Sequence, residues 1–262
     1  MNPEARQYFL TQLEQLPDSL QAGVMPVWED IADSLPEPDP AQPDWLGELP
    51  GVIACSDFIT GLLRRDTGYL TGLLDSGELF SPLDCNGMRD RLATALAATD
   101  DENRIMAILR QERNSAMLQI AFRDLSGWAD LDEVLSSLSQ CADVLLDTAL
   151  TRCAELLAPR YGMPIGEETG EPVRLVTFGM GKLGGGELNF SSDVDLIFCF
   201  SEHGETDGSR QVSNSEFFMR QARMFIKLIG NTTADGFVYR VDTRLRPNGD
   251  SGPLVLSFAA MD

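Results

Sequence analysis

The sequence predicts an α+β fold, in which a helical segment over residues 1–160 precedes a small mixed β-sheet over residues 161–262. Two observations support this class. Before Pro159, apolar residues recur at steps of three and four, which is typical of amphipathic helices. After it, short runs of β-branched and aromatic residues are bounded by glycine and serine, which is typical of strands. Two domains are therefore predicted, with a boundary near residue 160.

The helical pattern is clearest over residues 131–157, where apolar residues form one stripe and acidic residues lie opposite. Pro159 is predicted to end this helix, because proline has no backbone N–H to continue it. Residues 101–125 carry a second helical period and residues 56–74 a shorter one. Four prolines in the eight positions 36–43 predict an extended surface loop.

Three strands and one helix are predicted after Pro159. The strands are Val173–Phe178, Val194–Phe200 and Phe237–Leu245. Between the last two, Ser215–Ile229 repeats its apolar residues with a helical period. This order predicts a small mixed sheet that carries functional side chains at the ends of its strands.

The charge of the chain argues against two classes of partner. Among 262 residues, 41 are acidic and 20 are Lys or Arg, which gives a formal charge of -21. Such a charge repels nucleic-acid phosphates and anionic membranes. The N-terminus lacks a basic start followed by an apolar stretch, and nowhere do about 18 apolar residues run together. A soluble cytoplasmic protein that binds neither nucleic acid nor membrane is expected.

Cysteine and histidine usage gives little support for zinc, a disulfide framework or a hydrolase triad. The cysteines are odd in number and show no C-x-x-C spacing, so buried reduced thiols are expected. They are Cys55, Cys85, Cys141, Cys153 and Cys199. The single histidine, His203, lies in a polar stretch typical of a turn and is expected at the surface.

Two aspartates open the second predicted strand. Because side chains alternate along a strand, Asp193 and Asp195 point to the same side while Val194 turns into the core. Two carboxylates at such a distance repel each other unless a cation lies between them, and oxygen ligands suit Mg²⁺ or Mn²⁺. The pair therefore predicts a divalent-metal site. The alternative is structural, since a strand that follows a turn often begins with a solvated aspartate.

A third carboxylate, Asp242, lies on the third predicted strand in the run YRVDTRLRP. Core packing does not explain a row of charges there. With Arg244, Arg246 and Lys182 nearby, three carboxylates suit two metal ions and the phosphates of a nucleotide. If the three carboxylates share one site, the third strand must lie beside the second. The alternative is a surface strand that carries Arg–Asp ion pairs.

The glycine-rich loop between the first two strands matches G-x-G-x-x-G at Gly179, Gly181 and Gly184. Its spacing excludes a dinucleotide-binding fold, which needs a crossover helix and an acidic residue about 20 positions later. Here Asp193 follows Gly184 by only nine residues. A Walker loop is also excluded, because Lys182 is followed by leucine rather than serine or threonine. The glycines are expected to let backbone N–H groups approach a phosphate.

Two motifs in this order, GMGKLGGGELNFSSDVDLIF and RVDTRLRPNGDSGPLVLS, resemble the glutamine-synthetase adenylyltransferase family of the polymerase-β-like nucleotidyltransferase superfamily. Farther upstream, VIACSDFI and AMLQIAFRDLSGWADL resemble the helical region that precedes the catalytic module of that family. The resemblance runs from about Gly51 to the end of the chain. It implies a nucleotidyltransferase module over residues 161–262, incomplete at its C-terminus.

The resemblance assigns roles to the residues of both motifs. It implies that three aspartates are catalytic and hold Mg²⁺ or Mn²⁺: Asp193, Asp195 and Asp242. It also implies that a second set binds the nucleotide or phosphate: Gly181, Lys182, Gly184, Gly185, Ser192, Arg244 and Arg246.

The family contains two such modules in tandem, and the GGGELNFSSD form of the loop resembles the N-terminal one, which removes AMP. The resemblance implies that inorganic phosphate attacks a tyrosine-linked AMP on glutamine synthetase and releases ADP, which regulates nitrogen assimilation. Its implied partners are glutamine synthetase, the PII signalling protein, ATP or ADP, and phosphate. Family members continue well beyond residue 262, so a fragment is expected. The alternatives are ATP-dependent adenylylation of glutamine synthetase and a truncated, non-catalytic docking module.

Overall fold

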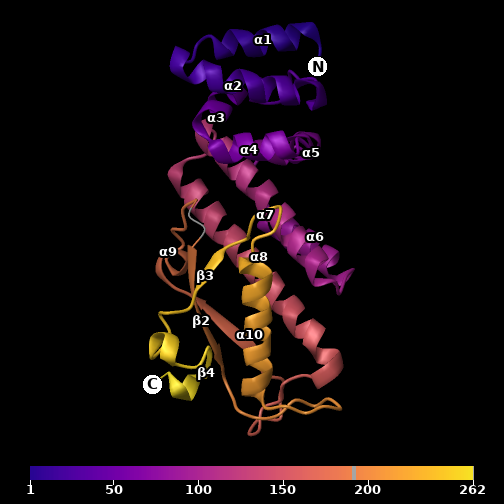
Figure 1. The fold of residues 1–262 in the computed structure, drawn as a ribbon, viewed down its shortest axis with the longest axis vertical. Coiled ribbons are helices and arrows are strands. Elements are labelled where there is room, and N and C mark those ends of the chain that lie inside the picture. The colour runs from indigo at the N-terminus through magenta and orange to yellow at the C-terminus, as the bar shows by residue number, and fades with distance from the viewer. Residues whose placement is uncertain (191–192, 262) are drawn as a thin grey trace. The chain divides into compact units, whose positions relative to one another are not determined.

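The computed structural model describes residues 1–190 and 193–261. The predicted α+β class is confirmed: these residues form many helices and one four-stranded mixed sheet (Figure 1). They group into two compact units. The first comprises residues 1–84 and 114–137, and the second comprises residues 85–113 and the chain from Leu138 onward. These units differ from the domains predicted on either side of residue 160, because the long helices α7 (Glu102–Leu125) and α8 (Leu131–Tyr161) contribute to both.

The first unit is a helical bundle around a single apolar core. It contains α1 (Pro3–Leu13), α2 (Asp18–Ile31), α3 (Trp45–Cys55), α4 (Asp57–Arg65), α5 (Gly68–Ser76) and the short turns η1 (Ala32–Ser34) and η2 (Glu78–Phe80). Phe9 and Trp28 stack in the core with ring centroids 3.7 Å apart. The proline-rich stretch 36–43 is a loop, as predicted. The helical period predicted over residues 56–74 is broken at Asp66, whose carboxylate accepts a hydrogen bond from the Gly68 N–H at 2.8 Å.

The two long helices match the sequence pattern except at one end. Helix α7 begins one residue later than predicted and ends at Leu125. The prediction that Pro159 ends α8 is wrong, since the helix continues to Tyr161. A proline in the last turn removes one backbone hydrogen bond, which a 31-residue helix tolerates. The helix ends where Gly162 adopts a left-handed conformation, φ 80°.

The second unit carries the sheet, together with α6 (Cys85–Ala97). Its strands are β1 (Leu175–Gly179), β2 (Asp193–Phe200), β3 (Arg240–Asp242) and β4 (Val255–Ser257). Strand β2 is central: β1 pairs with it antiparallel, whereas β3 and β4 pair with it in parallel at different positions. Helix α10 (Asn214–Gly230) packs against β3 and β4 (Figure 1). The one-turn helix α9 (Gly181–Gly184) follows β1, and η3 (Gly249–Ser251) and η4 (Phe258–Ala260) flank β4.

The sheet has an apolar core and differs in two ways from the predicted strands. Phe198 packs edge-on against Phe225 of α10, with centroids 5.8 Å apart. The third strand covers only Arg240–Asp242 of the predicted residues 237–245. Before it, the Val238 N–H donates to the Ile229 carbonyl, and after it the Arg244 N–H donates to the Asp242 carboxylate in a turn, so neither end pairs with β2. Strand β4 was not predicted, since its three residues are buried throughout and show no alternation.

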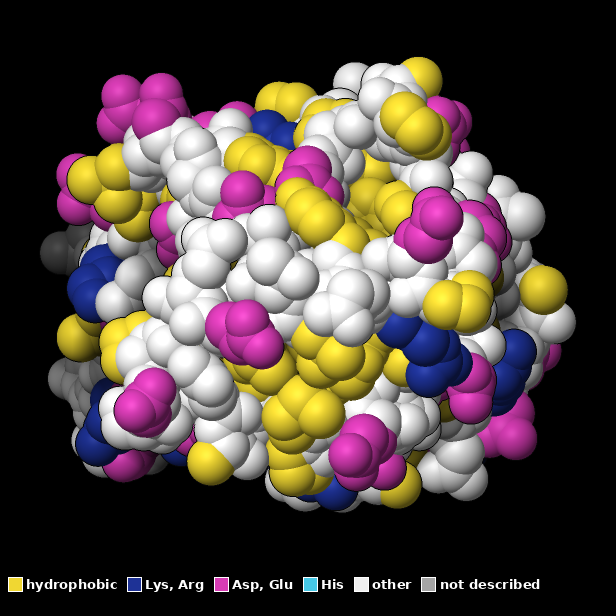
Figure 2. Space-filling model, turned by 90° about the horizontal axis from the view of Figure 1, so that it is seen from above, with side chains coloured by type: hydrophobic (Ala, Val, Ile, Leu, Met, Phe, Trp, Pro, Cys, Tyr) yellow, Lys and Arg dark blue, Asp and Glu magenta, His cyan; other side chains and the backbone are white. Residues whose placement is uncertain are grey.

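Surface and thiol chemistry follow the composition only in part. Acidic side chains are scattered over the face in Figure 2, and basic ones are fewer there. Cys141, Cys153 and Cys199 are buried free thiols, as expected, whereas Cys55 is exposed. Burial raises the pKa of the Cys141 thiol to about 12, which keeps it protonated and unreactive. His203 is exposed, as predicted.

Over the described residues no single helix is long and apolar enough to cross a membrane, although α3 and α4 pass that test together as a bent pair.

Candidate active site

The register of β2 and β3 brings the predicted carboxylates to one place. The strands are parallel, and Asp195 lies directly opposite Asp242, while Asp193 lies opposite Arg240. Side chains at opposed positions of adjacent strands point to the same face of a sheet. The prediction that the third strand returns beside the second is therefore confirmed, although 47 residues separate Asp195 from Asp242 in the chain.

An open pocket of about 640 Å³ lies over this pair of strands. It is lined by Asp193, Asp195, Arg240, Val241, Asp242, Thr243, Arg244 and Asp250. All three predicted aspartates and one predicted arginine thus face one cavity. Asp250 was missed by the sequence reasoning, because it lies in the turn NGDSG rather than on a strand and nothing in its spacing marks it.

Arginines hold two of the three carboxylates. Arg240 donates from Nε to Asp193 Oδ1 at 2.6 Å. Arg244 donates to Asp242 from its backbone N at 2.8 Å and from its side-chain Nε at 2.9 Å. The side-chain and backbone hydrogen bonds from Arg244 lower the pKa of Asp242 to about 2. Asp242 is therefore an anion at any neutral or mildly acidic pH.

Asp195 differs from the other two aspartates. Its carboxylate makes no hydrogen bond or ion pair with residues 1–190 or 193–261, and it is half-buried. The strand itself fixes its backbone, whose carbonyl accepts a hydrogen bond from the Met180 N–H at 2.8 Å. Asp195 is thus the aspartate of this pocket with no arginine bonded to it.

The glycine-rich segment lies beside Asp195, as one helical turn rather than an open loop. A Cβ added to Gly181, whose φ is 56°, would stand 3.2 Å from Asp195 Oδ2. A Cβ on Gly184 would stand only 2.4 Å from the Gly179 carbonyl oxygen, so this position excludes a side chain. Lys182 is exposed on the same turn, and the Gly185 N–H bonds to the Gly181 carbonyl at 3.1 Å. Ser192 lies outside the described residues.

Arg246 does not line the pocket itself, but its Nη1 lies 3.8 Å from Oδ1 of Asp250, which does. Its Nη1 donates to the Thr243 carbonyl at 2.7 Å and to the Thr243 hydroxyl at 2.8 Å. The Gly252 carbonyl accepts a further, longer bond at 3.5 Å. These contacts close the loop that follows β3, and phosphate binding by Arg246 stays a prediction.

The donor set suits a hard divalent cation, because the pocket presents three carboxylates on fixed strands. In the described part of the chain, however, no three Asp, Glu, His or Cys side chains meet closely enough to hold a metal ion. Two of the three carboxylates are bonded to arginines instead, Asp193 to Arg240 and Asp242 to Arg244. Metal binding by Asp193, Asp195 and Asp242 stays a prediction that requires these side chains to turn.

Comparison with known proteins bears on the same segment. A family model described as glutamate-ammonia ligase adenylyltransferase matches residues 46–262. The chain belongs to this family. The resemblance inferred from the two motifs is thereby confirmed, and every residue that lines the pocket lies inside the matched stretch.

Relatives in this family are named bifunctional glutamine synthetase adenylyltransferase/adenylyl-removing enzyme. The one from Thioalkalivibrio sulfidiphilus is 42% identical over 250 residues, which is 95% of this chain and 26% of the relative. The one from Pseudomonas aeruginosa is 45% identical over 212 residues, 80% of this chain and 22% of the relative. The one from Chromobacterium violaceum is 52% identical over 165 residues, which is 63% of this chain and 18% of the relative. The chain spans about a quarter of the length of the curated relatives it matches, or less.

Proposed function

We propose that the sheet-bearing unit is a metal-dependent nucleotidyltransferase that acts on glutamine synthetase and removes AMP from its adenylylated tyrosine. One observation carries the proposal: Asp195 lies opposite Asp242 on neighbouring parallel strands, in a pocket that Asp193 also lines. Membership of the adenylyltransferase family supports the substrate. The removing direction rests on the resemblance of the GGGELNFSSD loop to the removing module.

In the proposed reaction an oxygen of inorganic phosphate forms a bond to the phosphorus of the AMP group. The bond between that phosphorus and the tyrosine oxygen breaks, the tyrosine keeps the electron pair and takes a proton from solvent, and ADP leaves. Mg²⁺ or Mn²⁺ held by Asp193, Asp195 and Asp242 would neutralise negative charge on the phosphate oxygens.

The chain itself would supply positioning and charge. Gly181, which has no side chain, leaves room for a phosphate beside Asp195. Arg244 is exposed at the pocket and its guanidinium would bind phosphate oxygens, while Lys182 would approach from the turn beside Gly181. Gly184, Gly185, Ser192 and Arg246 complete the proposed phosphate set on the resemblance alone, and the PII signalling protein is a proposed regulatory partner on the same ground.

The second candidate is the forward reaction, in which ATP adenylylates glutamine synthetase. The names of the relatives favour it, because they combine both activities in one protein. Both directions need the same carboxylates and the same phosphate-binding groups. The products distinguish them, since phosphorolysis releases ADP and adenylylation releases pyrophosphate.

The test uses the purified chain with each substrate in turn. One reaction contains adenylylated glutamine synthetase, phosphate and Mg²⁺, and the other contains unmodified glutamine synthetase, ATP and Mg²⁺. Mass spectrometry of glutamine synthetase reports loss or gain of AMP. We expect loss of AMP with release of ADP in the first reaction. Gain of AMP in the second alone would assign the forward direction, and no change in either would favour the non-catalytic docking module.

Paired variants show whether the pocket is responsible. Asp195→Asn should abolish the reaction, because it removes the carboxylate that no arginine holds. Asp90→Asn on α6 removes an equal charge from an exposed position of the same unit and should leave the rate unchanged. An equal loss of rate in both variants would contradict the site.

A further inference from the structure

Three arginines lie around one tyrosine at the C-terminal end of α8, in the sheet-bearing unit, and a fourth lines the pocket beside it. The guanidinium carbons of Arg160 and Arg220 lie 5.3 Å from the centre of the Tyr161 ring, and that of Arg210 lies 5.7 Å from it. Arg223, one turn after Arg220 on α10, lines the pocket beside the same ring. We call Arg160, Arg210, Arg220 and Arg223 the Tyr161 arginine cluster.

The position of this cluster is fixed by the structure beneath it. Tyr161 is only 3% exposed, and its backbone carbonyl accepts a hydrogen bond from the Gly208 N–H at 3.1 Å. That contact belongs to the loop that carries Arg210, which is closed farther along by a bond from the Thr206 N–H to the Val212 carbonyl at 2.9 Å. Because these two hydrogen bonds already order the loop, little conformational entropy of the loop is lost when Arg210 binds a ligand.

Three of the four guanidinium groups have no acidic partner in the described parts of the chain. Arg220 is paired with Glu216, one turn earlier on α10. Arg160, Arg210 and Arg223 are exposed and form no ion pair with any described residue. A guanidinium that stacks on an aromatic ring keeps its in-plane N–H groups free to bind carboxylates in pairs. Three of the cluster's guanidinium groups are therefore donors without a carboxylate acceptor among the described residues, and the fourth, that of Arg220, bonds to Glu216.

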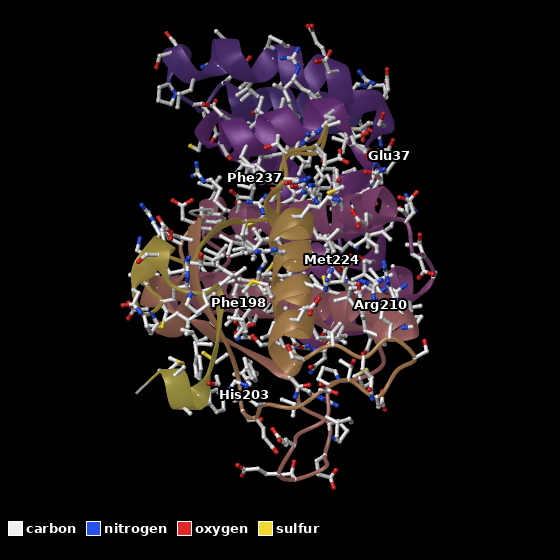
Figure 3. All side chains as sticks on the ribbon, turned by 60° about the horizontal axis from the view of Figure 1, so that its bottom comes forward. Glu37, Phe198, His203, Arg210, Met224 and Phe237 are labelled. Atoms are coloured by element: carbon white, nitrogen blue, oxygen red, sulfur yellow. The ribbon has the colours of Figure 1, made fainter. Side chains whose placement is uncertain are left out.

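Apolar side chains accompany the donors. Three members of the cluster, Arg160, Arg220 and Arg223, line an open pocket of about 440 Å³ whose remaining lining is Leu156, Leu157, Tyr161 and Met224. Figure 3 labels Met224 and Arg210, which lie on the same side of α10. Arginine, tyrosine and methionine are among the residue types enriched in protein–protein interfaces.

We propose that the Tyr161 arginine cluster docks an acidic segment of a partner protein, one that also inserts an apolar side chain against Leu157 and Met224. Charge complementarity identifies the occupant, because the cluster is a local positive patch on a chain with formal charge -21. Three guanidinium carbons each lie within 5.7 Å of one ring centre, so the cluster offers several guanidinium groups, which suits a segment with several carboxylates better than a single small anion. The proposal does not depend on the catalytic site, whose pocket is lined by other residues.

The test measures binding of a labelled peptide of about fifteen residues, rich in Glu and with two Leu, a length that an interface patch of this kind accommodates. The second peptide replaces every Glu by Gln. We expect the Glu peptide to bind the wild-type chain at least tenfold more tightly than the Gln peptide, with affinity that falls as salt rises. Arg160→Gln combined with Arg223→Gln should weaken the Glu peptide at least tenfold.

A matched double variant, Arg104→Gln with Arg174→Gln, removes two exposed arginines of the same unit outside the cluster and gives the same net charge. It should bind the Glu peptide as wild type does. Arg160→Lys with Arg223→Lys keeps the charge and should bind more tightly than the glutamine variant, and unchanged melting curves show that all variants fold. Equal weakening in both glutamine variants, no binding by wild type, or tighter binding of inorganic phosphate or of oligo-dT than of the Glu peptide would each overturn the proposal.

Discussion

The two halves of β2 differ in burial, in charge and in the strands that they pair with, although they are one continuous strand. Asp193 and Asp195, at its start, are accessible and pair with the three-residue strand β3. From Leu196 to Phe200 the strand is buried throughout and pairs with β1, and its last three residues also pair with β4. The buried half has a neighbouring strand on each side, and its Phe198 and Phe200 pack against Phe225 and Phe218 of α10.

This difference separates the part of the strand that stabilises the fold from the part that carries charge. Buried apolar contacts in the second half fix the direction of the strand, so the aspartates of the first half need no packing of their own. Like-charged carboxylates at one place destabilise a protein unless a partner compensates them. Here Arg240 and Arg244 compensate two of them. Substitutions in the buried half should therefore change mainly the free energy of unfolding, whereas substitutions in the exposed half should change mainly metal binding and catalysis.

The largest expected effect lies in the buried half. Phe198→Ala should lower the free energy of unfolding by about 3–5 kcal/mol, because it removes a fully buried ring and leaves a cavity against Phe225. Phe178→Ala on β1 is the control, since this ring is 43% exposed and should cost less than about 1 kcal/mol. Chemical denaturation of both variants measures the difference, and equal losses would contradict a division between the halves.

The next effect concerns the turn that leads into β3. Arg110 of α7 is fully buried and donates to three backbone carbonyls at 2.7–3.1 Å, those of Met106, Gly236 and Leu228, and also to that of Asn231. Burial lowers the pKa of its guanidinium. Arg110→Gln should cost about 3 kcal/mol, because it leaves buried carbonyls without donors.

Arg104→Gln, on an exposed position of the same helix, is the matched control and should change the free energy of unfolding by less than about 0.5 kcal/mol. Hydrogen exchange gives a second measurement. In the Arg110 variant, the amides of Gly236 and Val238 should exchange faster, since their turn loses its anchor. Unchanged exchange there would show that the buried arginine does not support β3.

The sequence predicted those parts of the fold whose pattern is local. Apolar periodicity predicted α7, α8 and α10, and alternation located the two aspartates of β2, because both signals depend only on neighbouring residues. The row of charged residues around Asp242 also predicted that its strand lies beside the strand that carries Asp193 and Asp195. The sequence predicted Arg–Asp ion pairs on the third strand as an alternative, but it did not predict β4, which arginine bonds to Asp193, or the hydrogen bonds of Arg246 to Thr243. These depend on which segments meet in space, and no spacing in the chain encodes that.

A smaller effect on stability is expected in the exposed half. Asp195→Asn should leave the melting temperature without metal unchanged or raised, because it removes one charge from a repelling group. With Mn²⁺ and a nucleotide, the wild-type chain should melt at a higher temperature, since a ligand that binds the folded state stabilises it. The variant should lose that increase. If Asp195→Asn unfolds the protein without metal, the carboxylate is structural and the site is wrong.

The smallest expected effect is a dependence on pH near Asp242. Arg244 lowers the pKa of this carboxyl to about 2, whereas an unfolded aspartate has a pKa of about 3.9. A lowered pKa means that the folded state binds the proton less readily, so this contact stabilises the fold above about pH 4 and the contribution is lost as the pH falls toward 2. The difference in the free energy of unfolding between wild type and Arg244→Gln should therefore be constant above about pH 4 and shrink below it. Asp242 is accessible, so salt should reduce the difference as well.

The Arg244→Gln variant should also bind Mn²⁺ more tightly, since Asp242 no longer has to leave an arginine. Arg246→Gln should have a smaller effect, because Arg246 acts on Asp242 only through its charge and donates its hydrogen bonds to Thr243 and the loop. Metal titration of the two variants separates these outcomes, and weaker Mn²⁺ binding by Arg244→Gln would show that Arg244 holds Asp242 in place for the metal rather than competing with it.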